Sequence, residues 1–399
     1  MILSHQCQMN CCFCSQGGAK QETMELALAR RIMEELKENG VGQIGFTGGE
    51  PLLYPNFEEI ILYGAKLGFA MSLITNGLLL DKYTKSSVFD HLKVIGVSLH
   101  GKEETHDKIT GLQGSYRVVK ENLFRFREKY PANKLSLNFT YCNLNDAPDE
   151  LESVIALAEK LNASVNVARI NEKGLSQNKD FSSDINAMLK HIDNYRRNDV
   201  PIHVINCIPH CVVNEEFRYL VHGCSAGISF CAIDSDGKVK LCPTADFMLG
   251  DLTTTSFMDV WNSPRMNEFR NLGWLPLKCK VCKEILKCFG ACKIDGDVGK
   301  WPSFQDSLAR KYLDDEWKML ASKRLLLKTN SVRSEGDSYI FMCEPLRFCS
   351  EEAVNIVTKM DGTMTGNDII RLFSNDDYEK ERIKEFILAL NADKMIYTV

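Results

Sequence analysis

The chain has 399 residues, of which 44% are hydrophobic and 25% charged, a composition typical of globular proteins with two or three domains. A formal net charge of -5 excludes attraction of nucleic acid or an anionic membrane by overall charge, and no apolar run reaches the ~20 residues of a membrane-spanning helix. Sixteen cysteines without a predicted signal peptide favour a reducing, cytoplasmic compartment and metal clusters over disulfides.

The first element in the chain is a cysteine loop, residues 7–14, with the sequence CQMNCCFC. Cys7, Cys11 and Cys14 have C-x3-C-x2-C spacing, and Phe13 precedes the third cysteine. Three thiolates on one short loop suit a cubic iron–sulfur cluster and leave one iron without a protein ligand. The alternative is a zinc site, for which no fourth Cys or His follows just downstream.

A short strand predicted over residues 43–46 leads into a glycine-rich turn, Gly48 to Pro51. Because glycine lacks a Cβ atom, the backbone of this turn can approach a ligand closely and adopt positive φ. We expect its backbone groups and the carboxylate of Glu50 to hold the ammonium group of a ligand. The alternative is an ordinary strand-to-helix turn.

Apolar strands and amphipathic helices then alternate up to residue 200. Strands are predicted over residues 2–3, 43–46, 70–75, 94–99, 135–140 and 164–167, and helices over 24–36, 57–66, 82–89, 116–129, 149–161 and 183–197. Apolar strands joined by crossover helices indicate a buried parallel sheet in an α/β fold. Six such units do not complete an eight-unit barrel.

These motifs resemble the radical S-adenosylmethionine (SAM) enzymes. The cysteine loop resembles their cluster signature, and FTGGEPLL, residues 46–53, resembles their methionine-binding element. The resemblance implies a partial (β/α)6 barrel over residues 1–200, with a 4Fe-4S cluster bound by Cys7, Cys11 and Cys14 and SAM on the open iron. It further implies a 5′-deoxyadenosyl radical that abstracts hydrogen from substrate, and an electron donor such as a flavodoxin or ferredoxin.

The resemblance also implies cofactor contacts at strand ends, where ligands of these enzymes sit. Polar residues that follow the third and fourth strands contact SAM in relatives. His100 is expected to face the substrate or simply to pack, and Arg169 to pair with the ligand carboxylate or to lie on the surface. No catalytic general base can be assigned. The expected cofactor-binding residues are Phe13, Gly48, Gly49, Glu50, Pro51, Asn76 and Ser98.

A second cysteine-rich block follows a composition shift near residue 201. Cys224, Gly237 and Cys242 have C-x12-G-x4-C spacing, and Cys279 begins a C-x2-C-x5-C-x3-C run. This resembles a SPASM domain, a small α+β extension assigned here to residues 201–302. The resemblance implies two auxiliary 4Fe-4S clusters. Their expected ligands are Cys224, Cys231, Cys242 and Cys292 for the first, and Cys279, Cys282, Cys288 and one further group for the second.

The eighth auxiliary ligand stays open. The family pattern expects a final cysteine soon after residue 292, but the next ones are Cys343 and Cys349. Cys207, Cys211 and a non-cysteine group are candidates, and an open cluster that binds a substrate thiolate is another. The alternative for the whole block is a pair of structural zinc sites.

The last part of the chain is predicted to contain a helical connector, residues 303–327, and a third unit, residues 328–399. Two short strands around residues 336–337, helices over 350–360, 365–372 and 378–390, a turn at Asp361-Gly362 and a strand over 394–399 are expected. This order resembles the winged-helix-like peptide chaperone of pyrroloquinoline quinone biosynthesis. The resemblance implies that a leader peptide adds a strand to its sheet edge; a winged-helix fold without a peptide role is the alternative.

These three units together predict a radical SAM/SPASM enzyme that modifies a ribosomally synthesised precursor peptide. The product is a thioether, a carbon–carbon cross-link or an epimerised residue. Alternatives are oxidation of a protein side chain, as in sulfatase maturation, and modification of a tetrapyrrole or other small molecule. From another class, a non-catalytic iron–sulfur electron carrier or a zinc scaffold is the alternative. No nucleic-acid or membrane partner is expected.

Overall fold

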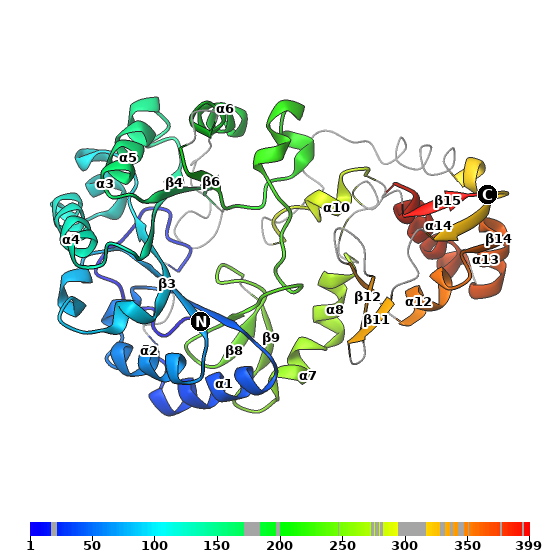
Figure 1. Ribbon diagram of the computed structural model, residues 1–399, viewed down its shortest axis with the longest axis horizontal. Helices are drawn as coiled ribbons and strands as arrows, with labels where there is room; N and C mark the ends of the chain where they lie inside the picture. The colour runs from blue at the N-terminus through cyan, green and yellow to red at the C-terminus, as the bar shows by residue number, and fades with distance from the viewer. Residues whose placement is uncertain are drawn as a thin grey trace. The chain divides into compact units, whose positions relative to one another are not determined.

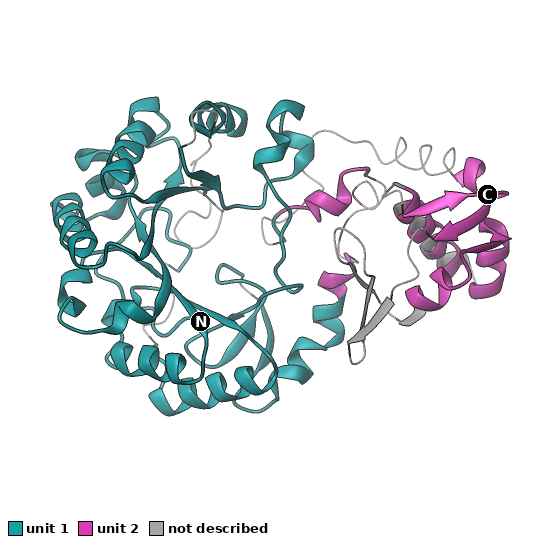
Figure 2. Ribbon diagram, in the orientation of Figure 1, with its two compact units in different colours: residues 1–267, 292–295 teal, residues 268–291, 296–399 magenta. Residues whose placement is uncertain are grey.

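The computed structural model divides into two compact units, Met1–Asn267 with Cys292–Asp295, and Glu268–Ala291 with Gly296–Val399 (Figure 2). Each unit has a hydrophobic core of its own. The residues that the structure describes are 1–16, 22–170, 184–196, 200–245, 247–272, 275, 279, 282–293, 317–327, 332–335, 338–341, 347–349, 351–375, 377–392 and 395–399.

Unit 1 is built on a six-stranded parallel sheet in which the strands follow one another in chain order. A parallel strand can follow its neighbour only through a crossover connection, and helices supply most of these connections along the outer side of the sheet (Figure 1). The predicted partial (β/α)6 barrel is therefore confirmed. Its strands are β1 (Gln43–Phe46), β2 (Ala70–Thr75), β3 (Leu92–Ser98), β4 (Lys134–Tyr141), β5 (Ser164–Arg169) and β6 (Ile202–Val204).

The helices of this barrel bury one apolar face each. In α1 the buried residues Ala29, Ile32, Met33 and Leu36 recur at the i, i+3, i+4, i+7 spacing of one helix face. Among the described residues, no helix of the chain is both long and apolar enough to cross a membrane. The helices are α1 (Leu26–Glu38), α2 (Phe57–Lys66), α3 (Glu103–Thr110), α4 (Ser115–Lys129), α5 (Pro148–Lys160) and α6 (Ile185–Arg196).

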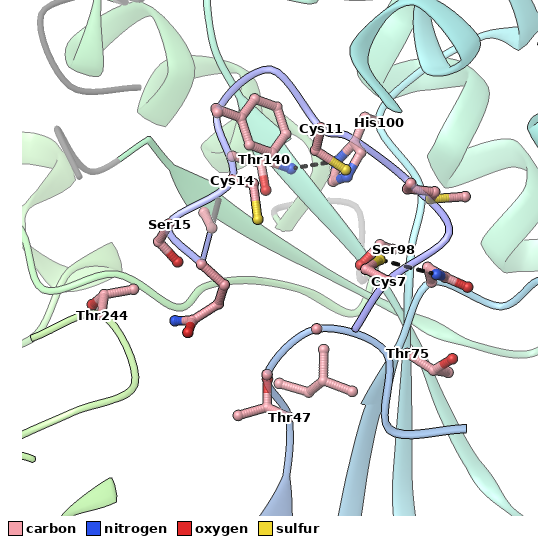
Figure 3. Close-up of a pocket in the computed structure, with 18 of the residues that line it drawn as sticks. Cys7, Cys11, Cys14, Ser15, Thr47, Thr75, Ser98, His100, Thr140 and Thr244 are labelled. Carbon is pink, nitrogen blue, oxygen red and sulfur yellow. Dashed lines mark hydrogen bonds between the residues drawn. The ribbon is translucent and has the colours of Figure 1, made fainter. Parts of the chain in front are cut away.

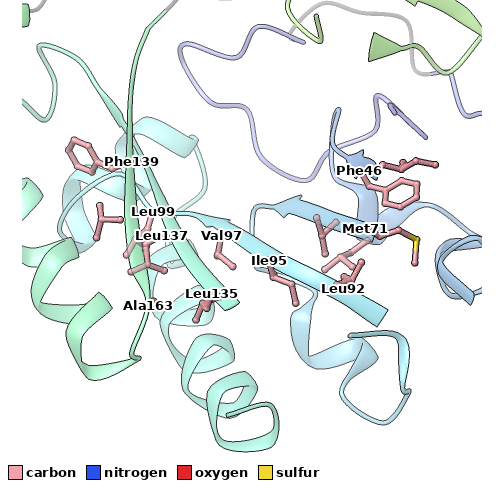
Figure 4. Close-up of a cluster of buried hydrophobic side chains, with 14 of the residues drawn as sticks. Phe46, Met71, Leu92, Ile95, Val97, Leu99, Leu135, Leu137, Phe139 and Ala163 are labelled. Atoms are coloured by element: carbon pink, nitrogen blue, oxygen red, sulfur yellow. The ribbon is translucent and has the colours of Figure 1, made fainter. Parts of the chain in front are cut away.

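The two faces of the sheet differ in polarity. Odd-numbered residues such as Ile95 and Val97 of β3 and Leu137 of β4 are fully buried in the main core (Figure 4). Side chains alternate along a strand, so the even-numbered residues of β3, β4 and β5 face the other side. There Asn166 Nδ2 donates to Asn138 Oδ1 at 3.0 Å. The strand sequences therefore place a polar surface on the inside of the barrel.

Four details of unit 1 differ from the sequence prediction. Residues 2–3 form no strand, because Ile2 makes only an isolated parallel bridge with Thr47. The predicted helix over residues 82–89 is replaced by two 3-10 turns, η2 (Leu80–Tyr83) and η3 (Val88–His91). Helix α3 was not predicted, because its polar sequence has little apolar periodicity. Strand β6 pairs with β5, so the sheet continues past residue 200.

The second half of unit 1 carries a small antiparallel sheet, β7 (Ala232–Ile233), β8 (Lys238–Lys240) and β9 (Met248–Asp251). Strands β7 and β8 form a hairpin in which Ile233 pairs with Val239, and Gly237 in its turn has a φ of +83°. Ile2 N donates to Ile233 O at 2.8 Å and ties this hairpin to the start of the chain. The elements η5 (His210–Val212), η6 (Glu215–Leu220), α7 (Phe257–Trp261) and α8 (Pro264–Arg270) complete this part.

Unit 2 contains α10 (Ile285–Cys288), two three-stranded antiparallel sheets and three further helices. Its core includes Leu325, Ile369 and Ile387, and α13 begins with a capping box between Thr365 and Asp368. Its strands are β10 (Arg324–Leu327), β11 (Val332–Glu335), β12 (Ser338–Phe341), β13 (Arg347–Cys349), β14 (Asp361–Thr365) and β15 (Ile396–Thr398), and its further helices are α12 (Glu351–Val357), α13 (Gly366–Phe373) and α14 (Asp377–Ala392).

Two predictions for this region are wrong in detail. The end of the expected helical connector is strand β10, which pairs with both β14 and β15 and buries Leu325 completely. The expected turn at Asp361-Gly362 begins strand β14. A central strand of four residues is too short to show a clear period in the sequence. Residues 303–316 of the expected connector lie outside the described residues.

Candidate functional site

A cavity of about 580 Å³ lies at the carboxyl ends of the parallel strands (Figure 3). Most of the residues that the sequence predicts to bind the first cluster or SAM line this cavity. They are Cys7, Cys11, Phe13, Cys14, Gly48, Gly49, Asn76 and Ser98. Glu50 and Pro51 are buried and do not belong to this lining. The structure thus brings the cysteine loop, the glycine turn and the two polar strand ends to one place.

The backbone of the cysteine loop is fixed by the end of α3. Asn10 N donates to Thr110 O and Cys12 N donates to Ile109 O, both at 2.9 Å. These contacts hold the middle of the loop through its main chain, which leaves the three spaced thiols at the cavity. Cys12, which breaks the spacing, is not among the cavity-lining residues.

The two glycines of the turn are required by the chain itself. Gly48 has a φ of +129°, and a Cβ atom there would lie 2.6 Å from the Ile2 side chain. A Cβ atom on Gly49 would collide with the carbonyl oxygen of Gln6, because Gly49 N and Glu50 N donate to Ser4 O and Gln6 O. The turn therefore packs directly under the segment that enters the cysteine loop, in addition to lining the cavity.

The carboxylate of Glu50, which was expected to hold a ligand ammonium group, is buried and hydrogen-bonded within the protein. The side chain is 0% exposed. Oε1 accepts from Leu52 N at 3.0 Å and from Thr75 Oγ1 at 2.7 Å, and Oε2 accepts from Asn76 N at 2.7 Å. Burial raises the pKa of Glu50 to about 7, against the opposing effect of these hydrogen bonds. Glu50 therefore joins the glycine turn to the end of β2.

Asn76 connects this junction to the first thiol. Its Nδ2 donates to the sulfur of Cys7 at 3.6 Å and to Gln8 Oε1 at 3.1 Å, while its Oδ1 accepts from Leu78 N. An amide hydrogen bond to sulfur favours a negatively charged thiolate or a cluster sulfur. Asn76 thus contacts the cysteine loop directly, which spacing alone did not indicate.

His100 lies on the wall of the cavity and is 4% exposed (Figure 3). Burial, together with neighbouring His106, lowers the pKa of His100 to about 3, so the ring is neutral at physiological pH. Thr140 N donates to His100 Nδ1 at 3.2 Å, which leaves the proton on Nε2. The ring of Phe13 meets His100 edge-on with 5.1 Å between centroids. Both expected roles of His100, packing and facing the cavity, are therefore compatible.

Two contacts tie the ends of the cysteine loop to the second half of unit 1. Before the loop, His5 Nε2 lies 2.6 Å from Asp234 Oδ1 in the β7–β8 hairpin. Burial raises the pKa of Asp234, but the hydrogen bond with His5 and the charge of Lys240 outweigh it and hold that pKa well below its usual range. After the loop, Gln16 Nε2 donates to Pro243 O at 2.7 Å.

Sequence reasoning missed several residues that line the cavity. Thr140 and Asn206 follow the same rule as Ser98, because each lies at or just beyond the carboxyl end of a strand. Arg169, already a candidate in the sequence for pairing with a ligand carboxylate, ends β5 and lines the cavity, and its backbone N donates to Asn206 Oδ1 at 2.6 Å. Thr244 follows Cys242 by two residues and carried no signal in the sequence.

The auxiliary cysteines are divided between the two units. Cys224, Cys231, Cys242 and Cys292 belong to unit 1, and Cys279, Cys282 and Cys288 belong to unit 2. In unit 2, Cys282 N donates to Cys279 O at 3.1 Å, and Cys288 ends α10. Cys343, the next cysteine in the chain after Cys292, lies outside the described residues.

The chemistry of the thiols fits iron–sulfur clusters. None of the fourteen cysteines whose side chains the structure describes forms a disulfide. Burial raises the pKa of the Cys11 thiol to about 12 and also raises that of Cys7. Positive iron would favour the thiolate form at these positions, since metal ligation deprotonates a thiol. Within the described ranges, no three Cys, His, Asp or Glu side chains converge tightly enough for a single metal ion.

Comparison with protein families gives two matches. Residues 1–158 match the radical SAM superfamily, and residues 224–288 match SPASM, an iron–sulfur cluster-binding domain. The first match contains the cysteine loop and the glycine turn, and the second contains six of the auxiliary cysteines. The predicted resemblances to the radical SAM enzymes and to a SPASM domain are therefore confirmed.

Two curated relatives are similar over most of the chain. A PqqA peptide cyclase from Rhodopseudomonas palustris is 26% identical over 324 residues, which cover 73% of this chain and 80% of the relative. The sporulation killing factor maturation protein SkfB from Bacillus subtilis is 23% identical over 299 residues, which cover 73% of this chain and 68% of the relative.

Among solved structures, the fold resembles Streptococcus suis SuiB bound to its precursor peptide SuiA. The TM-score is 0.61 with 18% identity, and the match covers 76% of this chain and 73% of SuiB. SuiB bound to S-adenosylmethionine gives a TM-score of 0.60 with 19% identity, over 77% of this chain and 76% of SuiB. The likeness to these structures concerns the fold of this chain.

Proposed function

Because this chain is a radical SAM enzyme that carries a SPASM iron–sulfur domain, we propose that it modifies a ribosomally synthesised precursor peptide. The reaction removes a hydrogen atom from a peptide residue and leads to a thioether, a carbon–carbon cross-link or an epimerised centre. Support comes from relatives named as a peptide cyclase and a killing-factor maturation protein, and from the SuiB structure with its precursor peptide.

The observation that carries this proposal is the meeting of the cysteine loop and the glycine turn in one cavity. Cys7, Cys11 and Cys14 would hold a 4Fe-4S cluster and leave one iron for SAM. When bound, the cluster and SAM together supply a 5′-deoxyadenosyl radical. The cavity of about 580 Å³ is large enough for a small-molecule cofactor and the reacting part of a substrate.

The remaining site residues bind and orient SAM in this proposal. Exposed backbone groups at Gly48 and Gly49 receive its methionine end, and Ser98 and Asn76 provide polar contacts at the strand ends. Phe13 packs beside the cluster and, with His100, helps to exclude water from the reacting centre. Glu50 and Pro51 position the turn from behind and do not contact SAM.

The C-terminal residues would deliver the peptide. Helices α12, α13 and α14 with the sheet β14-β10-β15 form a winged-helix-like fold, and β11-β12-β13 form a second sheet. The outer strand of a three-stranded sheet offers unpaired main-chain groups to an extended leader peptide. We assign leader binding to this domain, because a substrate held there remains tethered while its modified part enters the cavity.

The auxiliary cysteines would hold two further 4Fe-4S clusters. Two cysteine sets in separate units support this number. Such clusters accept an electron from the substrate or bind a substrate sulfur, and an external flavodoxin or ferredoxin would reduce the radical-generating cluster. The lack of disulfides among the cysteines whose side chains are described fits the reducing cytoplasm.

Removal of residues 317–399 tests the peptide assignment. The cut follows residue 316, because Leu320 and Leu325 belong to the core of the C-terminal domain. We expect peptide conversion to fall at least tenfold (about 1.4 kcal/mol of lost binding), while 5′-deoxyadenosine release without peptide stays unchanged. Conversion is followed by mass spectrometry of synthetic candidate precursors, as loss of two hydrogens for a cross-link or deuterium uptake for epimerisation. Equal conversion by the shortened chain would overturn the assignment.

A further inference from the structure

The segment before the cysteine loop, residues 1–6, lies between the barrel and the small antiparallel sheet of unit 1. On one side it bonds the glycine turn, because Gly49 N donates to Ser4 O at 2.9 Å. On the other side it bonds strand β7, because Ile2 N donates to Ile233 O at 2.8 Å. This segment therefore links the part of the barrel that carries the glycine turn to the β7–β8 hairpin.

His5 lies where the glycine turn, the cysteine loop and the hairpin meet. Its main chain packs against the turn, because a Cβ atom on Gly49 would lie 2.6 Å from the carbonyl oxygen of His5. Its side chain is 7% exposed, lines the cavity and places Nε2 2.6 Å from Asp234 Oδ1 in the hairpin. Cys7 begins the cysteine loop two residues later. A displacement of His5 would therefore move the loop, the turn or both.

The carboxylate of Asp234 is held in place by the hairpin itself. Its Oδ1 also accepts from Ser235 N at 2.8 Å, and its Oδ2 accepts from Lys240 Nζ at 3.1 Å. The side chains of Asp234 and Lys240 are largely buried, at 16% and 14% exposed. Hydrogen bonds to an ionised carboxylate are about twice as strong as those between neutral groups. Asp234 is thus a fixed acceptor that orients the imidazole ring of His5.

The other end of the cysteine loop is attached to the same part of the chain. Gln16, two residues after Cys14, lines the cavity, and its Nε2 donates to Pro243 O at 2.7 Å. Pro243 follows the end of β8 by three residues. The three spaced thiols therefore lie between two contacts with the hairpin region, one on each side of the loop.

We propose that Asp234 is a positioning residue of the radical site, which acts through His5 to hold the cysteine loop and the glycine turn in the geometry that binds SAM. No local spacing indicates this role, because the two residues are 229 positions apart in the chain. Cys231 and Cys242, two of the expected auxiliary ligands, lie just before β7 and just after β8. The part of the chain expected to hold an auxiliary cluster therefore also supports the radical-generating one. The inference rests on the SAM site and is independent of the peptide reaction.

The test compares Asp234→Ala with the matched variant Asp236→Ala. The Asp236 carboxylate bonds Lys238 within the same hairpin. Binding of SAM to the reconstituted full-length chain is measured by equilibrium dialysis, and EPR records how SAM changes the spectrum of the reduced radical-generating cluster. We expect Asp234→Ala to bind SAM about tenfold more weakly, with an altered SAM-bound spectrum and the iron content of the parent. We expect Asp236→Ala to match the parent in all three measurements.

His5→Ala and the double variant with Asp234→Ala test whether the effect passes through His5. Both single variants break the same contact, so the double variant should bind SAM no more weakly than His5→Ala alone. Hydrogen exchange of the chain without SAM gives a readout that does not depend on the bound cofactor. The backbone amides of Gly49 and Glu50, which donate to the segment of His5, should exchange faster in Asp234→Ala than in Asp236→Ala.

Unchanged SAM binding in Asp234→Ala, or a double variant in which the two losses multiply, would overturn the proposal. If Asp234→Ala loses iron or its thermal unfolding transition, Asp234→Asn replaces it. That variant keeps an acceptor for His5 but directs an NH2 group at Lys240, so SAM binding should weaken about threefold, and unchanged binding would again overturn the proposal. These readouts involve no peptide, so they are separate from a failure of the proposed peptide reaction.

Discussion

The two cysteine sites of unit 1 differ in how the chain assembles them. The radical site takes its three thiols from one loop of eight residues, Cys7–Cys14, whose backbone is held by α3 and the glycine turn. The expected first auxiliary site takes its thiols from separate segments of the chain, at Cys224, Cys231, Cys242 and Cys292. Joining distant segments costs chain entropy, which grows with loop length. A cluster at the first site should therefore contribute mainly to catalysis. A cluster at the second site should also raise the free energy of unfolding.

The largest effect is expected from removing one thiol of the radical site. Cys14→Ala should abolish 5′-deoxyadenosine formation, by roughly 100-fold or more, because the cofactor supplies the reactive group. Its melting temperature should change little, since main-chain hydrogen bonds fix the loop. Cys12→Ala is the matched control in the same loop, and its release of 5′-deoxyadenosine should equal that of the parent. A loss of equal size in the control would contradict the assignment of the three spaced thiols.

The second effect concerns stability of the auxiliary site. Cys224→Ala should lower the melting temperature of the iron-loaded chain by about 5–10 °C, as expected when a cross-link worth about 2–4 kcal/mol is lost. Thermal unfolding under anaerobic conditions measures this shift. The comparison predicts that Cys14→Ala shifts the melting temperature by less than half as much. Equal shifts would show that the two sites contribute alike to stability.

The third prediction concerns Glu50, whose hydrogen bonds join the glycine turn to the end of β2. In Glu50→Gln one carboxylate oxygen becomes an NH2 group, and either Asn76 N–H or the pair of donors at Oε1 then faces another donor. An unsatisfied buried donor costs about 1–3 kcal/mol. We expect SAM to bind about tenfold more weakly, measured by equilibrium dialysis, with iron content unchanged. Glu59→Gln, an exposed glutamate paired with Arg30, is the control and should bind SAM normally.

The smallest expected effect is on the reduction potential of the cluster, and it tests the role of Asn76. Its Nδ2 donates to the Cys7 sulfur, so Asn76→Ala removes one hydrogen bond from the radical-generating cluster. A bond worth about 1 kcal/mol corresponds to a fall in reduction potential of about 40 mV, because the bond favours the more negative, reduced state. Redox titration followed by EPR measures the potential. Asn166→Ala removes an inner-face amide that bonds Asn138 and should leave that potential unchanged.

Local spacing made the radical site predictable from the sequence. The auxiliary site depends on residues far apart in the chain, so its ligands were less predictable. The C-x3-C-x2-C loop and the glycine turn are short motifs, so the sequence identifies their residues directly. The expected first auxiliary set joins Cys224, Cys231 and Cys242 to Cys292 in a later cysteine run, so local spacing alone does not decide which thiols belong to one cluster. The same holds for Glu50, because its partners Thr75 and Asn76 are 25 and 26 residues away.

Helices and strands were predictable where the segment was long enough to show a regular hydrophobic period. Helices such as α1 and α14 and strands β1 and β2 follow the predicted ranges closely. Strands β6 and β10 were missed, because three or four residues show too little alternation to distinguish a strand from a helix or a loop. Their assignment depends on partners, β5 for the first and β14 with β15 for the second.

The most direct test of the central claim is anaerobic incubation of the reconstituted chain with SAM and dithionite, followed by chromatography of the nucleoside products. The account predicts 5′-deoxyadenosine from the parent and from Cys12→Ala, and none above background from Cys14→Ala. If the parent releases none, or if Cys14→Ala releases as much as the parent, the cavity under the cysteine loop does not hold a radical SAM site.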